Sequence, residues 1–230
     1  MAPSGLTNPF GKKTMTRKAL CKLTERLDSA YNCVDHFEAL EEKRGYDIGK
    51  QLPAQLFKRG IESQLLEHWM SSAPSIHKLT SDGYDIEAGL TGCEWAAYLR
   101  VRNPIAVILR VYPKNRTARA EHILCQLLSS LIINLATLVP VEFNKVPDLC
   151  KENFELLAQG GARGIDAGCR IVEALPRLKL REAGMLCIVD ALNVAEARGA
   201  ADDVKQLKAV LSRMSARNNG HLLYTMARTR

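Results

Sequence analysis

The residues best suited to chemistry are the basic side chains of YLRVRNPIAVILRVYPKNRTAR, residues 98–119. This segment interleaves arginine and lysine with bulky apolar residues, and it holds no Asp or Glu. A solvated protein face normally mixes charges of both signs, because neighbouring like charges repel each other. A Lys or Arg that neutralises a phosphate releases a counterion, so many such contacts add up to a salt-dependent affinity. The segment therefore predicts a surface for a phosphate backbone.

Two further stretches, residues 1–24 and 204–230, also carry basic residues and no acid. The planar guanidinium group of arginine binds phosphate oxygens and stacks on bases, and a tyrosine within the first segment offers a second stacking group. The alternative is that these arginines lie over the core with buried stems and bind no ligand. The residues that we predict to contact nucleic acid are Arg100, Arg102, Arg110, Tyr112, Lys114, Arg116, Arg119, Lys12, Lys13, Arg17 and Lys18.

A second motif is MLCIVDALNV, residues 185–194. Its apolar run followed by Asp-x-x-Asn resembles the first strand of PIN- and NYN-type nucleases, in which an acid at a strand end helps to hold a metal. That chemistry needs several convergent carboxylates. After Asp190 only Glu196, Asp202 and Asp203 remain. We therefore expect a protein that is not an enzyme and that holds no metal.

The remaining chemical signals are weak. The glycine-rich residues 159–164 lack the Lys and Ser or Thr of a Walker loop, so they indicate the stop of one helix and the start of the next. The five histidines show no metal-ligand spacing, and no nucleophile–base motif is visible. The seven cysteines include no CxxC pair, which indicates buried thiols in a reducing compartment, cytoplasmic or nuclear. We expect no cofactor.

Length and composition limit the architecture. The chain has 230 residues, of which 47% are hydrophobic, so it can bury one large core or two smaller lobes. Charged residues at 25% argue against wholesale disorder. The formal net charge of +7 favours nucleic acid, anionic lipid or an acidic protein as a partner, without choosing among them.

The hydrophobic pattern predicts a mainly α-helical chain, a helical bundle of one or two lobes with flexible termini. We expect a flexible arm over residues 1–13, an N-terminal lobe over 14–75, a C-terminal lobe over 76–220 and a tail over 221–230. The first helix starts near Thr16 and its apolar stripe continues to Leu40, with Gly45 as the stop.

The central helix is expected over residues 117–138. The uncharged run 123–141 is about as long as a bilayer span, but its Gln, Ser, Asn and Pro residues favour a buried core helix, and we expect no transmembrane span. Further helices are expected within 146–161, 162–176, 180–199 and 201–218. Residues 105–112 are rich in β-branched residues and predict a strand that pairs with 97–102, giving a small β-hairpin near 97–112. A helix that ends before Pro113 is the alternative.

These observations predict a protein that binds nucleic acid, RNA rather than DNA, without strong sequence preference, since no base-reading motif is present. A basic arm, a helical body and a basic tail also suit a subunit that self-associates as a homo-oligomer along a polymer. In size and profile the chain is similar to the small helical nucleoproteins and coat proteins of RNA viruses. The alternative is a helical matrix or assembly protein whose basic face makes peripheral contact with an anionic membrane or meets an acidic protein.

Overall fold

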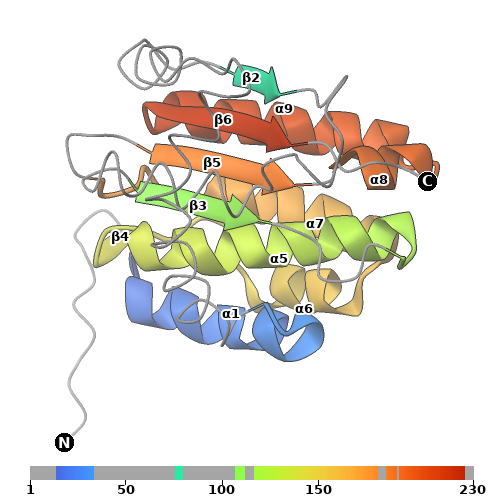
Figure 1. Cartoon of the computed structure of the whole chain (residues 1–230). Coiled ribbons are helices and arrows are strands. Elements are labelled where there is room, and N and C mark those ends of the chain that lie inside the picture. The colour runs from blue at the N-terminus through green and yellow to red at the C-terminus, as the bar shows by residue number, and fades with distance from the viewer. Residues whose placement is uncertain are drawn as a thin grey trace, which may run out of the picture.

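Helices dominate the described part of the chain. A computed structural model describes residues 14–33, 76–79, 107–111, 117–180, 185–190 and 192–225. Because helices make up most of the described residues, the predicted mainly α-helical fold is confirmed. The elements, drawn in Figure 1, are β1 (Thr14–Thr16), α1 (Arg17–Tyr31), β2 (Ile76–Leu79), β3 (Val107–Val111), α5 (Ala120–Leu138), β4 (Glu142–Asn144), α6 (Lys151–Gln159), α7 (Gly161–Ala174), β5 (Met185–Asp190), α8 (Leu192–Ala197), α9 (Ala201–Arg217) and β6 (Gly220–Thr225).

A four-stranded sheet in the order β2-β6-β5-β3 lies beside the helices, and all its strands run parallel. Parallel neighbours need long crossover connections. Here α5, α6 and α7 connect β3 to β5, and α8 and α9 connect β5 to β6. A separate two-stranded antiparallel sheet joins β1 to β4. Every described helix except α1 therefore serves in a crossover of an α/β arrangement, and the helices also pack on one another.

Strand β3 tests the predicted hairpin. Residues 107–111 do form a strand, so the alternative of a helix before Pro113 is wrong there. The partner that the structure gives this strand is β5, in parallel, with Leu109 opposite Cys187. The predicted hairpin partner, residues 97–102, lies outside the described residues.

The prediction of one helix over 180–199 is wrong for its middle. Residues 185–190 form β5, the strand between β6 and β3. Met185, Cys187 and Val189 join the core cluster that the helices share, whereas Leu186 and Ile188 occupy the opposite face and are equally buried. A strand buried on both faces is a continuous apolar run, which periodicity cannot distinguish from a buried helix.

The predicted C-terminal tail is also corrected. Residues 220–225 form β6, which lies between β2 and β5 and pairs with both. Leu222 is fully buried in this strand. Helix α1 of the predicted N-terminal lobe packs on α5 and α6 of the predicted C-terminal lobe. The arm over residues 1–13 lies outside the described residues.

The helices form two layers beside the sheet, as Figure 1 shows. Helices α5, α7 and α9 line one side of the strands, and α1 and α6 lie beyond α5, away from the sheet. Helix α5 is buried without interruption from Ile123 to Ile132, which confirms the predicted central helix. Among the described residues, α5 is the one helix long and apolar enough to cross a bilayer, but 61% of that stretch is buried inside the protein.

Helix α1 begins as predicted and ends early. The Thr16 side chain accepts a hydrogen bond from the Ala19 amide, the ordinary role of an N-cap threonine. The helix ends at Tyr31, because Asn32 takes up the left-handed conformation with φ 50° and closes the last turn. The predicted stop at Gly45 is therefore wrong, since Asn is one of the few residues that replace Gly at this position.

Candidate nucleic-acid interface

The carboxyl ends of three parallel strands meet at one edge of the sheet. Asp190 ends β5 opposite Thr225 of β6, and Val111 ends β3 opposite Val189. The three strands therefore end within one residue of each other, at the edge toward which the arrows in Figure 1 point. Ligands of open α/β sheets bind in the crevice outside the carboxyl ends of the strands. We name this region the carboxyl edge.

Two predicted site residues of the segment 98–119 fall within the described residues. Arg110 lies in β3 opposite Ile188 of β5. Arg119 directly precedes α5 as its N-cap residue and is exposed. The predicted site residues Arg100, Arg102, Tyr112, Lys114 and Arg116 lie outside the described residues.

The surroundings of Arg119 leave its charge available. Its carbonyl oxygen accepts a hydrogen bond from the Ile123 amide at 3.1 Å, which fixes the backbone at the first turn of α5. Within the described ranges, no ion pair involves its guanidinium group. The nearest acid in sequence is Glu121, which lies in the first turn of α5.

Arg17 and Lys18, predicted to bind nucleic acid together with the arm, lie at the start of α1, near the opposite end of α5. Arg17 donates a hydrogen bond from Nε to the Val139 carbonyl at 2.7 Å, so its positive charge stabilises the carboxyl end of that helix. Helix α5 has 19 residues, and at about 1.5 Å per residue its two ends lie about 28 Å apart. Lys18 is exposed next to Arg17, and Lys12 and Lys13 lie outside the described residues. The structure therefore does not bring Arg17 and Lys18 together with Arg119.

Two basic residues of the C-terminal stretch 204–230 pair with acids from other elements, and a third bonds to backbone carbonyls. Arg213 of α9 forms an ion pair with Glu173 of α7. Lys208 lies 3.6 Å from Glu196 of α8. Arg217 donates hydrogen bonds to the carbonyls of Val172 and Glu173, and so completes the end of α7. This stretch holds no acid in its own sequence, but acids from other elements lie next to it in the folded protein.

The carboxylates near the start of α9 form an acidic group. Burial raises the pKa of Asp203, and the charges of Asp166, Glu121 and Asp202 raise it further. Gln206 donates a hydrogen bond to Asp166 at 3.1 Å. In the described part of the chain, no three His, Cys, Asp or Glu residues are arranged to hold a metal ion.

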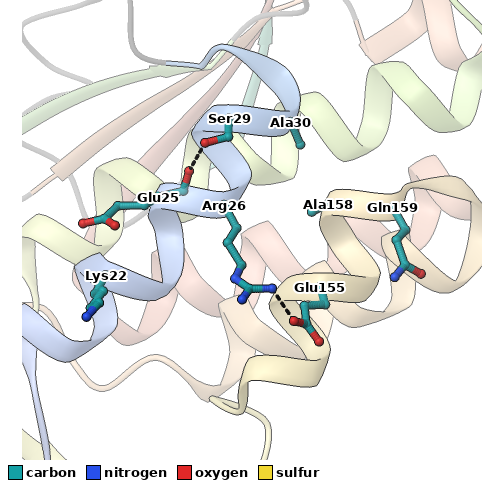
Figure 2. Close-up of a pocket in the computed structure, with 8 residues that line it drawn as sticks. All are labelled: Lys22, Glu25, Arg26, Ser29, Ala30, Glu155, Ala158 and Gln159. Carbon is teal, nitrogen blue, oxygen red and sulfur yellow. Dashed lines mark hydrogen bonds and ion pairs between the residues drawn. The ribbon is translucent and has the colours of Figure 1, made fainter.

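A shallow groove of about 690 Å³ lies between α1 and α6, on the layer of helices away from the sheet. Figure 2 shows Arg26 reaching across it to form an ion pair with Glu155. Glu25 and Lys22 line the same wall on α1. The lining therefore mixes both signs of charge, and it offers a polyanion no continuous positive surface.

One residue at the carboxyl edge escaped the sequence reasoning. Arg198 is exposed in the turn between α8 and α9, and it donates a hydrogen bond from Nη1 to the Ala118 carbonyl. In the sequence Arg198 lies between Glu196 and Asp202, and such mixed charges are typical of an ordinary solvated surface. Gly199 immediately after Arg198, with φ 93°, is the one local signal of a specific turn.

Comparisons with protein-family models, curated proteins and solved structures found no match to this chain.

Proposed function

We propose that this chain binds nucleic acid, RNA rather than DNA, through phosphate contacts at the carboxyl edge. The observation that carries the proposal is the position of Arg119. It is exposed, it forms no ion pair among the described residues, and it follows the carboxyl end of β3 at the edge where α/β sheets receive their ligands. Arg119 belongs to the acid-free segment 98–119, which also contains β3.

The proposed binding is sequence-tolerant, because phosphate contacts position a nucleic acid without reading its bases. Self-association along the polymer belongs to the same proposal. The support for the arm is weaker than the sequence suggested, since Arg17 is used at the far end of α5. Charge reversal distinguishes the two ends of this helix.

The test compares Arg119→Glu with Lys18→Glu by fluorescence anisotropy on single-stranded RNA. Both residues are exposed and both changes reverse one charge, so the comparison matches charge and exposure at the two ends of α5. Arg119→Glu is expected to weaken binding and to lower the slope of log affinity against log salt by about 0.7 or more. Lys18→Glu is expected to leave both quantities near those of the wild type. Circular dichroism checks that both variants are folded.

The opposite pattern, with loss in Lys18→Glu and none in Arg119→Glu, would place binding on the arm side. Arg100→Glu with Arg102→Glu extends the test to residues outside the described ranges. Flotation with vesicles of anionic lipid tests the alternative of a matrix or assembly protein. A chain that floats with the vesicles and purifies at low salt without absorbance from nucleic acid would replace our proposal.

A second candidate function is metal-dependent nucleolysis. The observation that favours it is the position of Asp190 at the carboxyl end of β5, flanked by β3 and β6. Carboxylates at such an edge are the ligands that Mg²⁺ prefers. Degradation of RNA that requires Mg²⁺ or Mn²⁺ and disappears in Asp190→Asn would establish this activity. Intact RNA after incubation with either ion would leave binding as the function.

A further inference from the structure

Arg198 stands in a tightly defined turn. The amides of Arg198 and Ala200 both donate to the Ala195 carbonyl, at 3.1 and 3.2 Å, and the Gly199 amide donates to Glu196 at 3.2 Å. Gly199 has φ 93°, a conformation that a side chain would strain. This turn closes α8, holds the backbone of Arg198 and leaves the residue exposed.

The side chain of Arg198 connects two crossovers of the sheet. Its Nη1 donates to the carbonyl of Ala118, which belongs to the connection from β3 to α5. Arg198 itself belongs to the connection from β5 to β6. A hydrogen bond from a charged donor is roughly twice as strong as a neutral one. Arg198 therefore fixes the carbonyl that directly precedes Arg119.

The charges around this contact leave both arginines positive. Glu196 lies 3.6 Å from Lys208, which compensates its charge. Glu121, Asp166 and Asp202 lie close enough to Asp203 for their charges to raise its pKa, so these acids gather around the start of α9. Among the described residues, neither Arg119 nor Arg198 forms an ion pair with any of them.

We propose that Arg198 is a positioning residue for phosphate binding: it holds the backbone at Ala118 so that the Arg119 side chain is presented to the ligand. This inference rests on the proposed function. An unanchored connection would have to be ordered when RNA binds, and that ordering costs free energy. A connection anchored by Arg198 has already met this cost in the free protein.

A double-mutant cycle with Arg119→Ala, Arg198→Ala and the combined variant tests the inference on single-stranded RNA. Arg198→Ala is expected to weaken binding severalfold. The combined variant is expected to bind no more weakly than Arg119→Ala, because Arg198 acts through Arg119. Additive losses would show that Arg198 contacts RNA independently and would overturn the positioning role.

Hydrogen exchange in the free protein gives a readout that needs no ligand. Arg198→Ala is expected to speed exchange of the amides between Thr117 and Ile123. Arg213→Ala, which removes an arginine contact between α9 and α7, is the matched control and is expected to leave these amides unchanged. Unchanged exchange in Arg198→Ala would overturn the inference. If the wild type fails to bind RNA, the proposed function is wrong and the inference falls with it, whatever the exchange shows.

Discussion

The packing of α7 on α5 depends on Gly168. A Cβ atom added at this position would lie 2.9 Å from Cδ1 and 3.2 Å from Cβ of Leu128, and 3.2 Å from Cδ1 of Leu157. Carbon atoms in contact prefer about 3.5–4.0 Å. Gly168→Ala therefore forces the two helices apart by a few tenths of an ångström or drives Leu128 from its rotamer. Overpacking of this kind costs about 1–3 kcal/mol.

The helix itself favours the same substitution. Alanine is about 1 kcal/mol more favourable than glycine in a helix interior. The two effects oppose each other, and we expect the clash to win, so that Gly168→Ala lowers the free energy of unfolding by about 1 kcal/mol. Urea denaturation followed by far-UV circular dichroism measures this change. Arg163→Ala, at an exposed position of the same helix, is the control and should stay within about 0.5 kcal/mol of the wild type.

The Leu128→Ala background gives a sharper result. Leu128 is fully buried, so its truncation alone costs about 2–5 kcal/mol. It also removes the atom closest to the added Cβ, so Gly168→Ala should become neutral or stabilising in that background. A coupling free energy of about 0.5–3 kcal/mol is expected between the two positions. If Gly168→Ala stabilises the protein equally in both backgrounds, α7 does not pack on α5 as described.

Three further results are expected. Asp203→Asn should stabilise the protein at neutral pH, because burial and neighbouring carboxylates raise the pKa of Asp203 and so disfavour its charged form. The gain in stability should vanish below roughly pH 4, where the carboxyl is protonated in both the folded and the unfolded protein. Stability that falls in Asp203→Asn across the whole pH range would contradict this reasoning. Arg17→Met should lower the free energy of unfolding by about 1–2 kcal/mol, because it removes a hydrogen bond and a charge at the end of α5. The exposed control Lys18→Met should change this free energy little. Equal losses in urea denaturation would show that Arg17 does not cap α5. Burial raises the pKa of the Cys187 thiol to about 12, so a thiol reagent at pH 8 should modify the partly exposed Cys150 before Cys187. Mass spectrometry of peptides measures the order of labelling, and early labelling of Cys187 would mean that β5 is accessible.

The long helices were predictable because their patterns are local. Helix α9 repeats apolar residues on one stripe, and Val204, Leu207 and Met214 are buried as expected. The helix after Gly160 was predictable for a similar reason, since glycines with positive φ separate α6 from α7. In these elements neighbouring residues in the chain decide the structure.

The sheet could not be predicted in the same way. Residues 185–189 are uniformly apolar because β5 is buried on both faces, and such a run lacks the alternation that identifies a strand. Strand β2 contributes four residues whose partners lie in β6 at the other end of the chain. Pairing over such a separation depends on tertiary contacts that no local pattern contains.

The candidate site was predicted in part for a related reason. A sequence shows which basic residues lack acidic neighbours along the chain. Arg119 is one of them and forms no ion pair among the described residues, while its contact with nucleic acid stays a prediction. Arg213 lies in the acid-free stretch 204–230, but its partner Glu173 lies on another helix. Ion pairs across elements removed part of the expected positive surface, and the turn after α8 supplied Arg198 in its place.

The division between core and edge makes the binding proposal separable from stability. Arg119 and Arg198 are exposed at the carboxyl edge, whereas the contacts that hold the helices together involve fully buried residues such as Leu128 and Phe154. Substitutions of exposed side chains usually change stability by less than about 0.5 kcal/mol. Loss of RNA binding in a stable Arg119 variant would therefore report on the edge itself. Loss that always accompanies unfolding would instead mean that these arginines serve the fold.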